Sequence, residues 1–358
     1  IELDPTLTAI AAYAFDGCSN LTGTLTLPSG VTIIGTSAFN GCSGFAGSLI
    51  IPEGVTSIGD YAFRSCSGFT GSLSLPTNLT SIGGAAFDGC SGFTGSLIIP
   101  EGVTSIGDYA FTSCSGFTGS LSLPTNLTSI GGAAFDGCSG FTGSLIIPEG
   151  VTSIGDYAFT SCSGFTGSLS LPTNLTSIGS TAFAYCSGFT GSLIIPSGVT
   201  SIRAGTFHKC VGFTGLVIPA GVTTIENLAF RTCYGLTGTL TLPAGLTHIE
   251  EAAFENCIRL TGTLTLPDSL TVIGRVAFRY CRGFESVYVP FNTSIDADAL
   301  PSTATKYTTG CVNQGTPATP SGACCSGNIE LDPTLTAIAA YAFDGCSNLT
   351  GTLTLPVG

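Results

Sequence analysis

A cysteine recurs every 24 residues along most of this chain, and that period constrains the fold more than any other feature of the sequence. Nine cysteines keep the spacing from Cys18 to Cys210, and three more, ending at Cys281, follow the deletion of one residue within 215–219. A fixed period of this length is typical of solenoids, in which every repeat is one structural unit stacked on the next. The sequence therefore predicts about 12 coils of 24 residues.

A second period, of 48 residues, lies above the first. Residues 43–90 and 91–138 are identical except at two positions. Such near-identity indicates that coils were duplicated in pairs, as blocks of 48 residues.

One coil, FTGSLIIPEGVTSIGDYAFTSCSG at 93–116, shows how the chain should turn back on itself. Leu97 and Ile99 alternate with outward positions, as in a strand with one buried face, and Pro100 ends that strand because proline cannot donate to a ladder. Residues 108–111 predict a short helical or 3₁₀ turn that brings an aromatic side chain into the core. The predicted fold class is thus a solenoid that is mostly β, with short helical or 3₁₀ turns.

A single coil of this kind is not stable by itself. Its few inward side chains bury too little apolar surface to offset the conformational entropy lost when 24 residues become ordered. Stacking supplies the missing hydrogen bonds between coils and a second packed face for each coil. The coils must therefore form one continuous array.

The stretch IPEGVTSIGDYAFTSC at 99–114 resembles the BspA-like (Treponema-type) leucine-rich repeats, and the resemblance covers essentially residues 1–300. It recurs in register, so that one phenylalanine column marks every coil: Phe15, Phe39, Phe63, Phe87, Phe111, Phe135, Phe159, Phe183, Phe207, Phe230, Phe254 and Phe278. The resemblance implies a leucine-rich repeat solenoid in a secreted or cell-surface protein that serves adhesion or scaffolding. It implies no catalytic machinery.

The pattern divides the chain into three segments. Residues 1–300 form the predicted solenoid, whose last coil, after Cys281, is degenerate and reads as a cap. Residues 301–328 lose the period and are rich in Pro, Thr, Ser and Gly, which marks a linker that also contains cysteine. Residues 329–358 begin a second solenoid unit, because 329–356 repeat the first 28 residues letter for letter. We expect the solenoid and its linker to be one unit of a tandem array.

Composition excludes two kinds of partner. Lysine and arginine number only nine and the formal net charge is -13, which argues against nucleic acid because nucleic-acid binders present clustered basic side chains. The sequence contains no run of about 18 apolar residues, so no membrane span is predicted.

The sixteen cysteines fall into two groups. Thirteen, including Cys346, occupy the repeat column, where they are either buried thiols or partners in disulfides between alternate coils. The other three, Cys311, Cys324 and Cys325, lie in the linker. We expect one of the adjacent pair to bond with Cys311 and the other to bond outward, to another coil or chain; the alternative is a local bond plus a free thiol. The linker lacks the paired spacing of a structural zinc site.

Six Asn-x-Ser/Thr sequons are candidates for glycosylation in a secreted eukaryotic protein. They are Asn20, Asn78, Asn126, Asn174, Asn292 and Asn348. The alternative is that asparagine merely favours the turn that follows each strand.

Columns of acids and hydroxyls suggest other ligands, but weakly. Acids recur every 48 residues, as at Glu101 and Asp108, yet no coil offers the oxygen cluster that calcium needs, so no metal and no cofactor are predicted. Threonine recurs once per coil, as at Thr104, where it suits an exposed strand; a glycan-binding or ice-binding face is the alternative. The only histidines, His208 and His248, fall in different columns and outside any catalytic motif, so we predict that the chain is not an enzyme.

Two functions remain. The first is an extracellular structural protein whose tandem repeats self-associate, end to end or between chains, into a filament or surface appendage. The second is an adhesin or recognition module at the cell surface, in which hydroxyl and tyrosine columns, including Tyr61, Tyr109 and Tyr157, contact a protein or a glycan.

Overall fold

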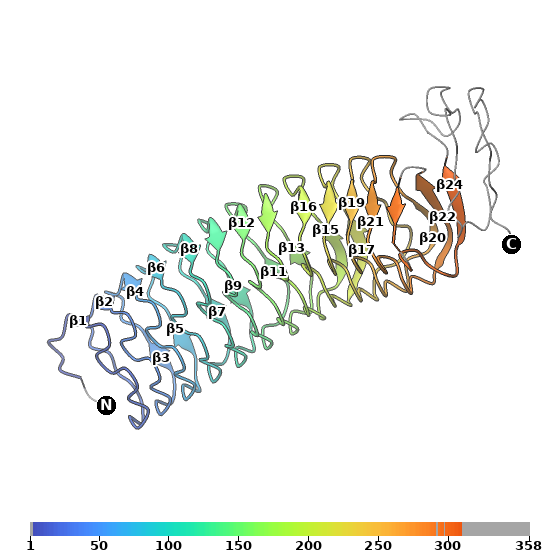
Figure 1. Cartoon of the computed structure of the whole chain (residues 1–358). Helices are drawn as coiled ribbons and strands as arrows, with labels where there is room; N and C mark the ends of the chain where they lie inside the picture. Colours follow the sequence, from blue (N-terminus) through green and yellow to red (C-terminus); the bar gives the residue numbers. More distant parts are fainter. Residues whose placement is uncertain (1–2, 291–292, 297, 310–358) are drawn as a thin grey trace, which may run out of the picture.

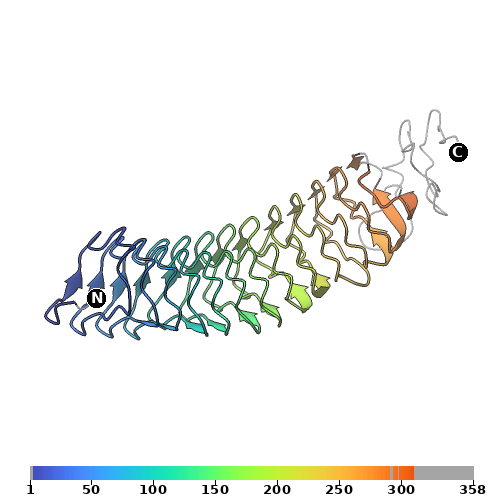
Figure 2. The same cartoon turned by 90° about the horizontal axis from the view of Figure 1, so that it is seen from below.

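The computed structural model describes residues 3–290, 293–296 and 298–309. They form an elongated, gently bent rod in which successive coils stack along one axis (Figures 1 and 2). The predicted solenoid, with about 12 coils and its like residues in rows, is confirmed. Within the described residues, no helix is long and apolar enough to cross a membrane.

Two parallel sheets, of eight and five strands, follow one another along one side of the rod (Figure 1). Each coil adds a strand, and the register advances by one coil, as in the pairing of Ile106 with Ile130. In most of these strands one side chain is buried, and it is an isoleucine because a β-branched residue fills an inward strand position well. The first eight strands are β1 (Ala9–Ile10), β2 (Ile33–Ile34), β4 (Ser57–Ile58), β6 (Ser81–Ile82), β8 (Ser105–Ile106), β10 (Ser129–Ile130), β12 (Ser153–Ile154) and β14 (Ser177–Ile178). Five more follow: β16 (Ser201–Ile202), β18 (Thr224–Ile225), β19 (His248–Ile249), β21 (Val272–Ile273) and β23 (Ser294–Ile295).

A second row of strands pairs two by two within each 48-residue block. The pairs are β3 (Leu49–Ile50) with β5 (Leu73–Ser74), β7 (Leu97–Ile98) with β9 (Leu121–Ser122), and β11 (Leu145–Ile146) with β13 (Leu169–Ser170). Longer strands continue the row toward the C-terminus: β15 (Gly191–Ile194) with β17 (Phe213–Val217), then β20 (Gly262–Thr265), β22 (Phe284–Pro290) and β24 (Thr305–Thr309). The alternation predicted for 97–99 is confirmed, because Leu97 and Ile99 are buried and Ile98 is exposed.

Stacked aromatic rings form the core. Phe111 has no exposed surface, and its ring lies 5.2 Å from that of Phe87 and 5.5 Å from that of Phe135, nearly parallel to both. A second column, which includes Phe93 and Phe117, stacks in the same way at 5.8 Å. The two columns meet edge to face, as expected of packed aromatic rings. Every coil is thus held by its neighbours on both sides.

The helical or 3₁₀ turn expected at 108–111 is absent from the described coils, which contain turns instead. Tyr109 adopts a left-handed backbone conformation (φ 60°), as does Ser113 (φ 59°). This directs alternate amides to the next coil: Tyr109 N–H donates to Gly132 O at 2.8 Å and Phe111 N–H to Ala134 O at 2.8 Å. The ladder between coils therefore uses the donors that a helix would need.

The last coil has the reduced form that the sequence indicates. Strand β22 lies beside β20, and β23 is the last strand of the five-stranded sheet. The first part of the segment 301–328 adds one more strand, because β24 pairs with β22 and the rings of Tyr288 and Tyr307 stack at 4.9 Å.

Close contact between coils explains one column of glycines and yields a prediction. A Cβ at Gly116 would collide with the carbonyl oxygens of Ser91 and Phe93, whereas a Cβ at Gly245 would lie 3.8 Å from the nearest backbone oxygen. We expect Gly116→Ala to lower the free energy of unfolding by about 2 kcal/mol, as overpacking does, and Gly245→Ala to change it by less than about 0.5 kcal/mol. Urea denaturation of both variants tests this, and equal effects would contradict it.

Candidate interaction surfaces

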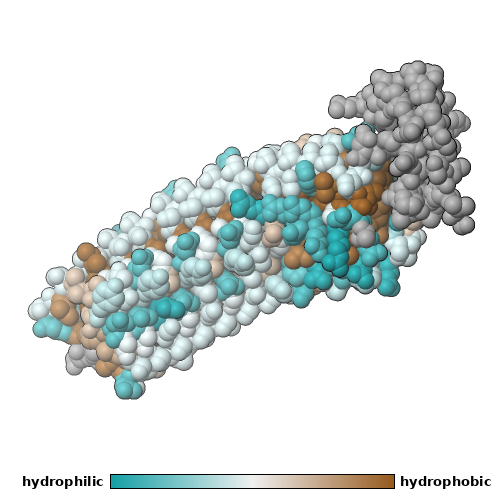
Figure 3. Space-filling view, in the orientation of Figure 1, coloured by the Kyte–Doolittle hydropathy of each residue, from teal (hydrophilic) through white to brown (hydrophobic). Residues whose placement is uncertain are grey.

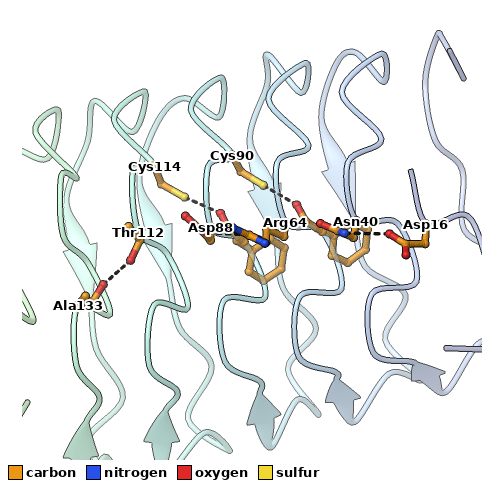
Figure 4. Close-up of polar contacts among 10 residues, drawn as sticks. Asp16, Asn40, Arg64, Asp88, Cys90, Thr112, Cys114 and Ala133 are labelled. Atoms are coloured by element: carbon orange, nitrogen blue, oxygen red, sulfur yellow. Dashed lines mark hydrogen bonds and ion pairs between the residues drawn. The ribbon is translucent and has the colours of Figure 1, made fainter. Parts of the chain in front are cut away.

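The repeat-column cysteines are structural thiols. From Cys42 to Cys281 they are buried, and each Sγ donates to a phenylalanine carbonyl of the preceding coil, as Cys114 does to Phe87 O at 3.1 Å (Figure 4). Every cysteine in the described part of the chain is a free thiol, so the alternative of disulfides between alternate coils is wrong there. Burial raises the pKa of Cys42 to about 11 and that of Cys233 to about 12, which makes these thiols poor nucleophiles.

The four remaining cysteines lie outside the described residues. They are Cys311, Cys324, Cys325 and Cys346. The cross-links predicted for the linker therefore stay a prediction.

The repeated acids join the two coils of a block. The Glu101 carboxylate accepts hydrogen bonds from Thr125 N–H at 2.9 Å and Thr125 Oγ1 at 2.7 Å, and Asp108 Oδ1 accepts one from Gly132 N–H at 2.6 Å. The same bonds recur from Glu53, Glu149, Asp60 and Asp156. Within the described residues, no three His, Cys, Asp or Glu side chains lie close enough together to hold a metal ion.

A polar column runs outside the phenylalanine stack (Figure 4). Asn40 Nδ2 donates to Asp16 Oδ1 at 2.8 Å, and the Arg64 guanidinium binds Asp88 at 3.0 Å. Both pairs span one coil step, so that side chains as well as amides connect neighbouring coils.

The threonine column is also used between coils. Thr104 lies in the exposed position just before β8, and its carbonyl accepts a hydrogen bond from Thr128 Oγ1 at 2.9 Å. The same bond recurs in other coils, for example between Thr80 Oγ1 and Thr56 O at 3.0 Å. The hydroxyls of alternate threonines in the central coils, such as Thr80 and Thr128, therefore have a partner within the fold.

Four of the six sequons lie on described turns. Asn20, Asn78, Asn126 and Asn174 are all exposed. The side-chain amides of the last three donate to the backbone carbonyls of Glu53, Glu101 and Glu149 at 3.1, 3.5 and 3.4 Å. Asn292 and Asn348 lie outside the described residues.

The two histidines occupy different environments. His208 is buried, its ring meets that of Tyr185 edge to face at 5.1 Å, and its Nδ1 has no hydrogen-bond partner. Burial lowers the pKa of His208, and the nearby cations Arg231 and Lys209 lower it further. His248 is exposed, and its Nδ1 contacts Thr247 Oγ1 at 2.9 Å. The fold places them in separate coils.

A shallow groove of about 610 Å³ crosses the coils along the eight-stranded sheet. Its floor follows a glycine column that includes Gly131 and Gly155, where a Cβ would meet the backbone of the preceding coil. Asp108 and Asp156 line it, and Arg203 lies where the glycine column ends. The groove combines hydroxyl, carboxylate and guanidinium groups.

Four isoleucines stand on the surface, one in every second coil. Ile50, Ile98 and Ile146 are each 65% exposed and Ile194 is 62% exposed. We name this set the isoleucine row. The visible face of the rod is mostly of intermediate hydropathy, with a broad hydrophilic area and adjoining hydrophobic areas toward the C-terminal end of the described residues (Figure 3). The sequence analysis did not single out the row, although its signal is present there: an outward strand position that alternates between isoleucine and serine.

Comparison with known proteins identifies the repeat. A family profile described as the BspA type leucine rich repeat region matches residues 1–118, 93–214, 200–312 and 322–358. A leucine-rich repeat protein from Bacteroides ovatus, known from its crystal structure, is 26% identical in sequence. Its TM-score is 0.70, and the match covers 86% of this chain and 77% of that one. A leucine rich cell surface protein from Faecalibacterium prausnitzii is 24% identical, with a TM-score of 0.50 over 83% of this chain and 88% of that one. No curated protein matches the sequence.

Proposed function

Because the chain belongs to the BspA-type leucine-rich repeat family, we propose that it is an extracellular structural scaffold whose units assemble into a filament or surface appendage. The observation that carries this proposal is the unbroken core. Stacked phenylalanine rings run from Phe15 to Phe278, so that one stiff rod spans the described solenoid. A stiff rod can span a long distance and transmit force along an appendage.

The sequence outside the described residues supports assembly. The exact return of the first coil after the linker favours a tandem array of rods. Cys311, Cys324 and Cys325 provide thiols for bonds between units or chains in an oxidising, extracellular setting. The cell-surface description of the Faecalibacterium prausnitzii protein supports the same location.

One observation favours a second candidate, a recognition module. The groove lined by Asp108, Asp156 and Arg203 offers the hydrogen-bonding groups that recognise a polyhydroxyl chain or an extended peptide. Tyr109 and Tyr157, each next in sequence to one of these acids, are exposed and add aromatic surface.

Negative-stain imaging and non-reducing electrophoresis of the full chain separate the two candidates. The scaffold proposal expects cross-linked species that disappear with reductant, and that are lost when Cys311, Cys324 and Cys325 are all changed to serine. Single rods and a monomer band in both lanes would contradict it. Binding to immobilised glycans or peptides that is reduced at least tenfold by Arg203→Ala would then favour recognition.

A further inference from the structure

The isoleucine row is built from strands that alternate with serine strands. Within each block Ile50 lies beside Ser74 and Ile98 beside Ser122. At a strand spacing of about 4.8 Å, successive isoleucines stand about 9.6 Å apart with an exposed serine between them. The surface is therefore a regular series of large and small side chains.

The fold does not require these isoleucines. In the same backbone position the alternate coils carry Ser74, Ser122 and Ser170, and those coils stack equally well. Burial in the rod is supplied by the flanking inward side chains, such as Leu97 and Ile99. Four exposed isoleucines in one line, extended by the exposed Val217 beside Ile194, thus need a reason outside the rod.

A row with this alternation fits a second copy of itself. If two rods lie antiparallel, related by a two-fold axis between the coils of Ile98 and Ser122, every isoleucine faces a small residue. Ile98 then faces Ser122 of the second copy, and Ile146 faces its Ser74. The remaining pairs are Ile50 with Ser170 and Ile194 with Thr26, which is also exposed. Such a two-fold contact is self-complementary and closed.

The glutamates next to the row alternate with threonines in the same way as the isoleucines alternate with serines. Glu53, Glu101 and Glu149 share the period of the isoleucines, and threonine takes their place in the alternate coils. In the antiparallel pair each carboxylate is therefore opposite a threonine rather than another carboxylate. This matters for a chain of net charge -13, because like charges face to face oppose association.

The contact area is sufficient. From Thr26 to Ile194 the strip is roughly 34 Å long by strand spacing, and six residues across it span about 20 Å. It thus covers roughly 700 Å² on each copy, close to the ~800 Å² per partner of a standard specific interface. We propose that the isoleucine row is the contact between two antiparallel copies of this chain. In this contact the coil of Ile98 on one copy faces the coil of Ser122 on the other. This lateral contact rests on the proposed scaffold function and adds side-by-side pairing to it.

Sedimentation velocity of the full chain in reductant tests the contact. We expect a concentration-dependent dimer whose Kd rises at least 100-fold in the double variant Ile98→Ser/Ile146→Ser. The matched variant Ser122→Ile should also raise the Kd, at least tenfold, because the added side chain collides with Ile98 of the second copy. Tighter association of Ser122→Ile would overturn the interlocking contact, since any merely sticky surface gains from an extra isoleucine. A monomer at 100 μM (about the concentration at which weak specific pairs form) would overturn it as well.

A cross-link tests the antiparallel register directly. Ser74 and Ile146 are three coils apart in one rod, too far for a disulfide, but opposite each other in the proposed pair. With the linker cysteines changed to serine, Ser74→Cys/Ile146→Cys should give an oxidised dimer, and Ser74→Cys alone should not. Absence of that dimer would overturn the register. The linker cross-links test the scaffold proposal separately. If they persist in Ile98→Ser/Ile146→Ser, in which the lateral contact is broken, the scaffold proposal stands whether or not the lateral contact does.

Discussion

Replacing Phe111 by alanine is expected to lower the free energy of unfolding by about 4 kcal/mol, in the middle of the range for buried aromatic residues. The side chain has no exposed surface and packs between the rings of Phe87 and Phe135. Its loss leaves a cavity in the middle of the rod, where both neighbouring coils lose a stacking partner.

The transition should also change shape. Stability in a solenoid is approximately a sum of coil terms and nearest-neighbour terms. A weak interface at the centre therefore uncouples the two halves, and urea denaturation followed by circular dichroism should resolve two steps in place of one. The control is Tyr109→Ala in the same coil: Tyr109 is exposed, and alanine already occupies its position at Ala85 and Ala133. Equal losses in the two variants would contradict the stacked core.

Stability is expected to fall steeply above about pH 8.5, the ordinary pKa of a thiol in an unfolded chain. Burial raises the pKa of ten column cysteines in the folded rod: Cys42, Cys66, Cys90, Cys114, Cys138, Cys162, Cys186, Cys210, Cys233 and Cys257. Between that pH and the raised native values, the unfolded chain releases these protons and the folded chain keeps them. The unfolded state then binds fewer protons, so the free energy of unfolding decreases as pH rises.

The size of this effect is large because the thiols are many. Each contributes up to about 1.4 kcal/mol per pH unit, which gives on the order of 10 kcal/mol per unit for the column. Urea midpoints in reductant at pH 7, 8.5, 9.5 and 10.5 (spanning the pKa range of about 8.5 to 11) measure it. Cys114→Ala/Cys138→Ala should reduce the slope by about a fifth, even though it lowers stability at neutral pH. A flat response across this range would mean that the thiols are not sheltered.

The solenoid could be predicted because its signals are periodic and local. Phe111, Cys114 and the pair Leu97 and Ile99 each recur at one spacing, and stacking is the arrangement that buries all of them at once. The prediction of a helical turn at Tyr109 was wrong, because no sequence pattern indicates that a tyrosine adopts a left-handed backbone conformation. Its conformation is set by an amide that bonds to the next coil.

The surfaces were harder to predict than the core. The spacing of Glu101 and Asp108 does not reveal their role, because their partners are groups of the next coil, 24 residues away. Ile98 was placed correctly on the outward side of its strand, but its relation to the next isoleucine becomes visible only when the coils are stacked. A pattern read along one coil does not reveal what neighbouring coils present together.

The pairing of β7 with β9 inside one block, and of β11 with β13 inside the next, has a consequence for how such a gene can vary. Gain or loss of a whole 48-residue block alters the length of the rod by roughly 10 Å and leaves every isoleucine in phase with its mate. Insertion of a single 24-residue coil would place isoleucine against isoleucine beyond that point. Unequal recombination in steps of two coils thus changes the length of the rod without changing its contact surface. The length of the rod can therefore vary between lineages, by drift or by selection, while the contact is kept.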